Sequence, residues 1–591
     1  MRKNIIISLL LVIFSMAICF ALAACNNKNG SGENSADSEK KYSEGLKYVL
    51  SDDKTFYYVC GIGSCSDADV FLPSTHEGKP VKGIWSQAFQ NCTNLASVTI
   101  GDNVTSIGNY AFSGCSSLTN IVIPNNVTTI GGNSFQNCTN LTSVTIGNGV
   151  TSIYGNSFQN CTNLANVTIG DNVTSIEKYT FSGCSSLTNI VIPNNVTTIS
   201  KNAFGNCINL TSVTIGNNVT SIEGSAFYNC YKLVEVINKS SLNIISGDYA
   251  NGKVGSYAKT VHNGDSKIVK KDNYIFITGD DGVNYLIEYI GNASDLILPE
   301  SYDGEYYAIN GYAFYKTDNL KSIKIPNCVT SIGEYSFRNC TNLASVTIGA
   351  GVTSIEKYTF SGCSSLASVT LINGEAEISD SAFYKCEAIK YNEDDYGYYL
   401  GCDTSPYLVF MKQKGSSCII NDGCVNILGS FNTSINTLKM PSGVKRINED
   451  AFYYTTVITS AEIPAFAIKY LKKVKNVDDI IVTSGDIGNY AFSDMELKSV
   501  TIASNATYIG MYAFQNCFYL DTVYIPNSVT EIGKNIFHTS GWSVDPTIIY
   551  NGTMEQWKNI VKDKQWKGTN GIYGTSVSIT IKCVDGTLIE E

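Results

Sequence analysis

A repeat of 23 residues runs through most of this 591-residue chain and limits the folds it can adopt. The repeat is most visible in phenylalanine: seven residues lie 23 apart, four more form a second run with the same spacing, and four others form a third, looser run. In chain order these positions are Phe89, Phe112, Phe135, Phe158, Phe181, Phe204, Phe227, Phe314, Phe337, Phe360, Phe383, Phe452, Phe492, Phe514 and Phe537. A fixed period of this length is the sequence signature of a solenoid, in which each repeat contacts only its neighbours.

A single repeat is too small to fold alone. The copy Leu95–Cys115 contains an alternating segment, Val98–Ile100, then a second short extended segment, Val104–Ile107, and a turn around Phe112. Roughly six large apolar side chains contribute ~1.5–3 kcal/mol each when buried. Fixing the backbone of one repeat costs ~25–45 kcal/mol. Stacking lets the strands of successive repeats pair, so we predict a solenoid of parallel strands joined by short helical turns.

The repeat resembles a known class of protein. The segment Leu118–Asn126 has the pattern Leu-x-x-Ile-x-Ile-x-x-Asn of leucine-rich repeat strands. The full form, with Ile-Gly, Ala-Phe and Cys as in Ile107–Cys115, is similar to the BspA-like subclass, and the resemblance covers most of residues 81–540. It implies a leucine-rich repeat solenoid that is mainly parallel β and interrupted by β-hairpin-like insertions. Members are typically bacterial surface proteins implicated in adhesion to host matrix or to other microbes.

Composition argues against nucleic-acid binding and against catalysis. Charged residues make up 16% of the chain, 41 Lys and Arg stand against 52 Asp and Glu, and the net charge is −11. No basic stripe is present to neutralise phosphates. The three histidines, His76, His262 and His538, leave little for a metal site or an acid/base set. We find no catalytic set, so we expect no enzyme activity, no cofactor and no metal.

The N-terminus predicts export and a lipid anchor. Arg2 and Lys3 precede the apolar stretch Ile5–Phe20, which is the arrangement of a signal peptide. The segment Leu22–Cys25, Leu-Ala-Ala-Cys, resembles the bacterial lipobox, whose cysteine receives a diacylglycerol thioether and becomes the first residue of the mature chain. An uncleaved membrane-spanning helix is the alternative. The resemblance implies anchoring through Cys25, with the chain exposed on the extracytoplasmic side of the cell envelope.

The repeat runs and their interruptions divide the chain. An aromatic-rich stretch followed by Leu-Pro and Ile precedes both Phe89 and Phe314, so we interpret each as a hairpin-like module that opens an array. The stretch between Phe383 and Phe452 is either degenerate repeat or an inserted hairpin. The predicted divisions are a signal peptide (1–24), a flexible tether (25–44), an N-terminal hairpin-like cap (45–80), the first array (81–237), an insertion with a second opening module (238–308), the second array (309–390), a Tyr-rich degenerate repeat or insertion (391–440), the third array (441–545) and a C-terminal cap (546–591).

The C-terminal cap leaves the repeat pattern. Ile548–Tyr550 is predicted to be a strand, and Thr553 and Gln556 form a capping box that opens a short helix. We expect Ser576–Cys583 to be the final strand. The side chains expected on one side of the helix are Met554, Trp557, Ile560 and Val561. Trp542, Trp557 and Trp566 fall in or near this end; they are typical either of sugar binding or of sealing a solenoid, and we favour sealing.

Eleven of the 20 cysteines occupy one position of the repeat. Stacked rungs ~4.8 Å apart bring neighbouring Cα atoms within disulfide reach. The same position holds Thr317, Thr455, Met495 and Ser540 in other copies, so we expect buried free thiols. The column consists of Cys92, Cys115, Cys138, Cys161, Cys184, Cys207, Cys230, Cys340, Cys363, Cys386 and Cys517. Off the column, the pairs Cys60/Cys65 and Cys418/Cys424 are weak metal signals, and a local disulfide or no bond is favoured.

The candidate binding surface is the outer face of the first strand of each repeat. In every Leu-x-x-Val-x-Ile segment, the residues before and after the central Val or Ile point away from the core. The predicted face consists of Ser97, Thr99, Asn120, Val122, Ser143, Thr145, Asn166, Thr168, Asn189, Val191, Ser212 and Thr214. Ser, Asn, Thr and Val also suit a plain solvated strand. The Tyr-rich segments Tyr285–Tyr289 and Tyr396–Tyr407 are the competing contact surface.

These patterns predict a lipid-anchored, non-enzymatic surface protein that binds an extracellular macromolecule, protein or glycan, in adhesion. The alternative is a cell-envelope scaffold or glycan-capturing surface protein without a host target. The sequence names neither the ligand nor the oligomeric state.

Overall fold

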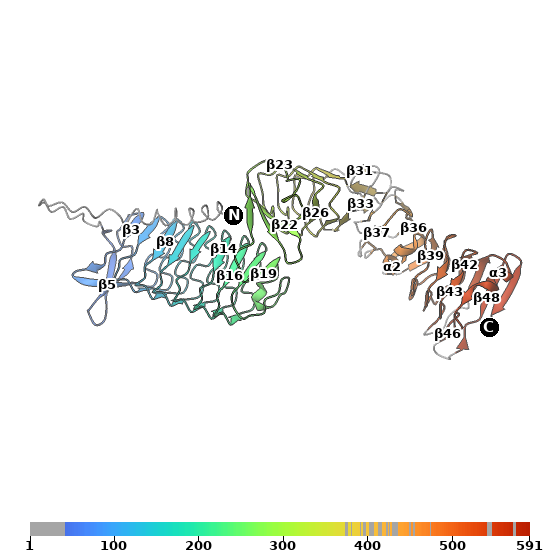
Figure 1. The fold of residues 1–591 in the computed structure, drawn as a ribbon, viewed down its shortest axis with the longest axis horizontal. Helices are drawn as coiled ribbons and strands as arrows, with labels where there is room; N and C mark the ends of the chain where they lie inside the picture. The colour runs from blue at the N-terminus through green and yellow to red at the C-terminus, as the bar shows by residue number, and fades with distance from the viewer. Residues whose placement is uncertain are drawn as a thin grey trace.

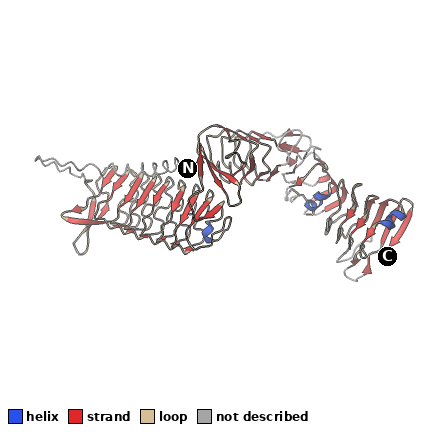
Figure 2. Ribbon diagram, viewed as in Figure 1, coloured by secondary structure: helices blue, strands red, loops and turns tan. Residues whose placement is uncertain are grey.

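The computed structural model describes residues 42–591 apart from 373–375, 380, 390–391, 394–396, 401–406, 412–416, 421–423, 425, 428–434, 448–450, 453–454, 473, 475, 540–545, 571–574 and 591. The chain forms a solenoid in three arrays that follow one another in chain order (Figure 1). Strands dominate, and Figure 2 shows helix at only a few short places in the described chain. These are η1 (Asn251–Lys253), η2 (Ala465–Ala467) with α2 (Ile468–Leu471), and α3 (Met554–Asn559). The predicted repeat solenoid with hairpin insertions is confirmed.

Each repeat of the first array gives one strand to each of two ladders, whose repeat strands pair parallel. The register follows the repeat, because Ser143 pairs with Asn120 on one side and with Asn166 on the other. The first ladder contains β3 (Asp69–Phe71), β6 (Ser97–Thr99), β8 (Asn120–Ile123), β10 (Ser143–Ile146) and β12 (Asn166–Thr168), and then a separate sheet of β14 (Asn189–Val191), β16 (Ser212–Ile215), β18 (Glu235–Asn238) and β19 (Thr260–His262). The second ladder contains β1 (Lys47–Leu50), β2 (Tyr57–Gly61), β5 (Lys79–Ile84), β7 (Ser106–Ile107), β9 (Thr129–Ile130), β11 (Ser152–Ile153), β13 (Ser175–Ile176), β15 (Thr198–Ile199) and β17 (Ser221–Ile222), with β4 (Thr75–His76) on β5. At the start of this second ladder, β1 and β4 pair antiparallel with β2 and β5.

An antiparallel hairpin opens the second array. β21 (Tyr274–Thr278) pairs antiparallel with β22 (Asn284–Tyr289), which then pairs parallel with the repeat strand β24 (Tyr307–Ile309). The remaining strands of this sheet are β20 (Val269–Lys271), β26 (Val329–Ile332), β28 (Ser354–Ile355) and β30 (Glu377–Ile378), and the facing sheet contains β23 (Asp295–Ile297), β25 (Ser322–Ile325), β27 (Ser345–Ile348) and β29 (Ser368–Leu371).

The third array opens in the same way. β32 (Gly397–Leu400) pairs antiparallel with β33 (Tyr407–Met411), and β33 pairs parallel with β35 (Asn426–Ile427). This sheet also contains β31 (Asn392–Glu393) and β37 (Arg446–Ile447). The large sheet contains β34 (Ser417–Ile419), β36 (Ile435–Lys439), β38 (Val457–Ile463), β39 (Asn476–Val482), β40 (Ser499–Thr501), β42 (Thr522–Pro526), β44 (Thr547–Asn551), β48 (Ile579–Cys583) and β49 (Gly586–Glu590), and the smaller sheets contain β41 (Tyr508–Ile509), β43 (Glu531–Ile532), β45 (Val561–Lys562), β46 (Thr569–Asn570) and β47 (Thr575–Ser576).

The repeated phenylalanines form a stacked column in the core. Phe112 and Phe135 are fully buried, and their ring centroids lie 5.1 Å apart with planes 10° from parallel. The same stacking runs from Phe89 to Phe227 in the first array and from Phe314 to Phe383 in the second. Each ring fills the space between its neighbours, so the core is continuous along the solenoid rather than confined to single repeats.

Two turn positions have a left-handed backbone in most repeats. In one copy these are Asn133 (φ 57°) and Asn137 (φ 60°), two residues before and two after the buried Phe135. The second position is occupied by Gly114 (φ 75°) in the preceding copy. Asn and Gly adopt this conformation most readily, which explains why they dominate the second position. The first position is Asn in some copies and Tyr in others, as at Tyr110 and Tyr179.

The C-terminal cap differs from the predicted one in two details. The capping box is present, since the Thr553 side chain accepts a hydrogen bond from the Gln556 backbone N–H and the Gln556 side chain accepts from that of Thr553. The prediction that Ile560 and Val561 lie on the helix is wrong: α3 ends at Asn559 with Ile560 as its C-cap, and Val561 lies in β45, which pairs with β43. The segment ending at Cys583 is not the final strand, because β49 folds back antiparallel on β48.

Two tryptophans lie inside the C-terminal cap. Trp557 is fully buried, and its ring packs edge-on against that of Trp566 with centroids 5.8 Å apart. The Trp557 indole N–H donates to Glu590 of β49 at 3.1 Å. These rings seal the end of the solenoid, while Trp542 lies outside the described residues.

Candidate ligand-binding face

The register of the first ladder aligns the predicted face residues in two columns. Thr145 of β10 pairs with Val122 of β8 and with Thr168 of β12. The residues before the central Val or Ile, such as Ser143, align in the second column. Backbone pairing therefore fixes the spacing of these side chains. In the continuous sheet the structure brings together Ser97, Thr99, Asn120, Val122, Ser143, Thr145, Asn166 and Thr168.

Regular backbone pairing stops between β12 and β14, although the two strands remain neighbours. Asn189 pairs with Ser212, and Val191 pairs with Thr214, but these residues belong to the separate sheet that starts at β14. The predicted face thus consists of two ladders rather than one. A ligand that spans both must cross a change in backbone pairing between Thr168 and Asn189.

The face is open to solvent and uncharged. Val122 and Val191 are 61% and 59% exposed, and Thr145 is also exposed. The serines nearer the edge, such as Ser143, are half-buried. The surface therefore offers hydroxyl and amide groups at regular intervals together with small apolar contacts.

Acidic residues that the sequence analysis missed stand at both ends of this face. Asp69 of β3 occupies the face position before Ser97, whose hydroxyl donates to Asp69 Oδ1 at 2.5 Å. Glu235 of β18 follows Ser212, whose hydroxyl donates to Glu235 Oε2 at 2.8 Å. The sequence does contain a signal for β3: Val70 and Leu72 alternate before a proline, as Ile121 and Ile123 do before Pro124.

Glu235 is a fully buried carboxylate. Besides Ser212, it accepts hydrogen bonds from the Ser266 hydroxyl at 2.7 Å and the Lys267 backbone N–H at 2.5 Å, and it lies 3.2 Å from His262 Nε2. This network satisfies the carboxylate and fixes the loop that leads into the second array. It lies between β18 and β19, the last strand of the ladder.

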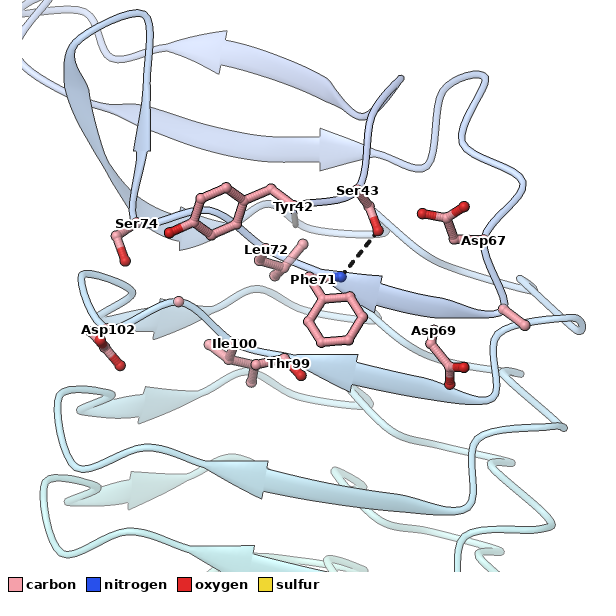
Figure 3. A pocket seen from close by; sticks show the side chains of 12 residues that line it. Tyr42, Ser43, Asp67, Asp69, Phe71, Leu72, Ser74, Thr99, Ile100 and Asp102 are labelled. Carbon is pink, nitrogen blue, oxygen red and sulfur yellow. Dashed lines mark hydrogen bonds between the residues drawn. The ribbon is translucent and has the colours of Figure 1, made fainter. Parts of the chain in front are cut away.

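A cavity of about 880 Å³ lies at the first rung of the face (Figure 3). Phe71 of β3 and Thr99 of β6 lie on its sheet side, and Tyr42 lies on the other side of Leu72. A second cavity of about 480 Å³ lies over the corresponding face of the third array and is lined by residues including Tyr524 and Lys582. Both cavities therefore lie on the ladder that the first strands of the repeats form.

The competing tyrosines of the second opening module have structural contacts. The Tyr285 hydroxyl donates to Asp281 at 2.6 Å, and the Lys259 ammonium lies 4.3 Å from its ring centroid. Burial, together with Asp281, raises the pKa of Tyr285. The Tyr289 hydroxyl accepts from the Ala293 backbone N–H. These rings are held in place by the hairpin, and the side chains of Tyr396–Tyr407 lie outside the described residues.

The column cysteines are packed against the backbone of the preceding repeat. The Cys138 thiol donates to the Phe112 carbonyl at 3.1 Å, and the contact recurs in other copies. Burial raises the pKa of the Cys161 thiol, and burial raises that of Cys517 to about 12. Buried thiols with raised pKa values are poor nucleophiles and poor metal ligands. The column supports the core and does not form a reactive site.

Several expectations fall outside these observations. Cys25 and the predicted signal peptide lie outside the described residues. Within the described residues, no group of three or more His, Cys, Asp or Glu side chains could hold a metal ion. No helix in the described part of the chain is both long and apolar enough to cross a membrane.

The fold defines a leucine-rich repeat solenoid with an open strand face. The family described as BspA type leucine rich repeat region (6 copies) matches residues 72–187, 151–253, 291–393, 409–484 and 465–545. The matches extend over more than half of the chain, which therefore belongs to the BspA-type leucine-rich repeat family.

Solved structures of similar proteins come from several bacteria. A leucine rich cell surface protein from Faecalibacterium prausnitzii is 22% identical, with 89% of this chain and 99% of that chain covered and a TM-score of 0.31. A leucine-rich repeat protein from Bacteroides ovatus is 20% identical, with 83% and 95% covered and a TM-score of 0.26. The pneumococcal vaccine antigen PcpA is 14% identical, with 88% and 80% covered and a TM-score of 0.21. A search of curated protein sequences finds no match.

Proposed function

We propose that this chain is a lipid-anchored, non-enzymatic bacterial surface protein that binds extracellular macromolecules through its strand face, in adhesion to host matrix or other cells. The observation that carries the proposal is the face itself: exposed, uncharged side chains held in register on successive strands. The lipobox-like segment Leu22–Cys25 supports the anchor. Family membership and the cell surface protein from Faecalibacterium prausnitzii support the location.

The chemistry of the face favours an extended ligand. One hydroxyl hydrogen bond contributes about 0.5–1.5 kcal/mol, so a single rung binds weakly. A chain-like protein segment or glycan that contacts several rungs adds these contributions without new association costs for each contact. A single change such as Thr145→Ala is therefore expected to lower affinity by at most ~0.5–1.5 kcal/mol.

A binding screen tests the proposal. Detergent-solubilised full chain is measured against purified extracellular-matrix proteins, polysaccharides and cell-envelope extracts. Binding to matrix proteins or foreign cells supports adhesion. Co-purification with envelope partners alone supports a scaffold without a host target, and binding that is unaffected by changes to the strand face would contradict the proposed site.

A further inference from the structure

The cavity at the first rung differs from the rest of the strand face in its chemistry. Its wall carries two exposed aromatic rings, Tyr42 (43% exposed) and Phe71 (44%), whereas the ladder beyond it is made of hydroxyl, amide and Val side chains. Figure 3 shows the Phe71 ring between Asp69 at one end of the cavity and Asp102 at the other. Asp67 lies at the same end as Asp69. The cavity thus combines ring faces with carboxylates on both sides.

The charges in this cavity are all negative. Asp67, Asp69 and Asp102 line it, and none of the described residues that line it is Lys or Arg. Aspartates are ionised at neutral pH, and a concave site lined by one sign of charge concentrates counter-charges. The cavity in the third array has the opposite character, because its lining includes Lys582 and no Asp or Glu among the described residues. The preference for cations therefore belongs to the first cavity.

Backbone contacts hold the walls in place before a ligand binds. Ser43 N–H donates to the Phe71 carbonyl, and the Ser43 hydroxyl accepts from the Phe71 N–H, both at 3.1 Å. These bonds fix the chain at Tyr42 beside the edge strand β3. The Ser97 hydroxyl orients Asp69 through its Oδ1 atom. A site whose backbone is already held and whose carboxylate is oriented loses less entropy on binding.

We propose that this cavity binds an extended segment of a partner protein that bears lysine or arginine side chains. Two carboxylate ends accept two cationic groups, and the rings of Tyr42 and Phe71 take the alkyl stems and the cation faces. The inference rests on the proposed function, since the cavity forms the first rung of the strand face, and it specifies the class of partner that this rung accepts.

Other occupants have a weaker basis in the structure. A neutral sugar would stack on the rings but would not use the three carboxylates. A choline group carries only one cation for carboxylates at two ends. Lys40 and Lys41 of this chain directly precede Tyr42 in the sequence and are tested as a competing occupant.

Fluorescence anisotropy of labelled hexalysine on the detergent-solubilised full chain tests the proposal at about 50 mM salt. Hexalysine is expected to bind, and hexalysine acetylated on every side-chain amine is not. The double variant Asp69→Asn with Asp102→Asn is expected to weaken binding at least about tenfold. Phe71→Ala is expected to weaken it about two- to fivefold.

The repeat supplies matched controls. Asp171 occupies the turn position of Asp102 three repeats further on, and Asp295 occupies the position of Asp69 in the edge strand of the second array, where Ser322 donates to it as Ser97 does to Asp69. Asp171→Asn with Asp295→Asn removes the same charge and should leave hexalysine affinity unchanged. Thermal melting checks that each variant remains folded.

Four results would overturn the proposal. The first two are an equal loss of affinity in the control variant and wild-type affinity in the Asp69/Asp102 variant. The third is binding of maltohexaose or choline that depends on Phe71, without binding of hexalysine. The fourth is hexalysine binding that occurs only when Lys40→Gln and Lys41→Gln are present. The last result would assign the cavity to the chain's own lysines. A variant with Thr145, Thr168 and Thr214 changed to Lys separates this proposal from the proposed function, because it alters the ladder outside the cavity. If it loses the macromolecular ligand but still binds hexalysine, the strand face binds the macromolecule and the cavity binds cations independently. If it keeps the macromolecular ligand, the proposed function fails while the cavity proposal stands.

Discussion

Replacing Cys138 by Ala measures what the cysteine column contributes to stability. Cys138 is fully buried, and its thiol donates to the Phe112 carbonyl at 3.1 Å. That carbonyl also accepts from the Cys115 backbone N–H at 3.2 Å, so the substitution does not leave it without a donor. The lost sulfur is worth about one buried methylene, ~0.8 kcal/mol, and the weak thiol hydrogen bond adds ~0.5 kcal/mol. We expect a total cost of about 1–2 kcal/mol.

The assay is urea denaturation of the full chain, with amide hydrogen exchange in strands β8 and β10 as a local readout. Cys92→Ala is the matched control, because Cys92 holds the same position in the first copy but is only half-buried. It should cost less than about 0.5 kcal/mol. Reducing agent should leave the stability of the wild-type chain unchanged. A loss of about 2–4 kcal/mol on reduction, matched by the same loss in Cys138→Ala, would show disulfides in the column and refute the packing interpretation.

Three further predictions follow from buried and terminal groups. Phe158→Ala should lower the free energy of unfolding by about 3–5 kcal/mol in urea denaturation, since this buried ring stacks on its neighbours at 5.1 and 5.4 Å. Tyr154→Ala, at a ring that is 53% exposed, should cost less than ~0.5 kcal/mol. Equal costs for the two variants would contradict the stacked core. Burial raises the pKa of the Cys161 thiol above 9.0, so the thiol stays protonated in the folded chain and ionises in the unfolded one. Stability should be constant below about pH 8 and fall above about pH 9, less steeply in Cys161→Ala; identical pH profiles would be inconsistent with this. Cys25→Ala should yield an unprocessed precursor without lipid in mass spectrometry of the N-terminus, and a wild-type chain that begins at Met1 without lipid would exclude the anchor.

The solenoid could be predicted because the same local pattern recurs in successive repeats, and each copy predicts the same structure. The spacing of Phe112 and Phe135 determines which residues stack, and alternation in Val98–Ile100 determines which side chains face outward. The left-handed turn at Asn137 was also accessible, since Asn or Gly recurs there. Features of this kind recur from copy to copy, so a sequence pattern that would predict a strand or turn only weakly in one copy predicts it strongly in the array.

The parts that sequence reasoning missed are those that occur once. β3 lacks the leading leucine of the repeat, so Asp69 and Phe71 were not assigned to the face although their register extends it. The interruption between β12 and β14 depends on backbone pairing, which side-chain periodicity does not encode. The final strand β49 forms by folding back on β48, and only tertiary contacts determine that choice.

The strand face is the central claim, and adding charge to it is the most direct test. Thr145→Lys, Thr168→Lys and Thr214→Lys place three cations on the face outside the cavity at the first rung. The matched control changes Thr151, Thr174 and Thr197 to Lys. These exposed threonines lie on the turn before the second strand, in the repeats of Thr145 and Thr168 and in the repeat before that of Thr214. Each donates to a backbone carbonyl of the preceding copy. We predict that the face variant keeps its melting temperature and loses affinity for the ligand found in the screen, while the control binds as the wild type does. Wild-type affinity in a folded face variant would contradict the account.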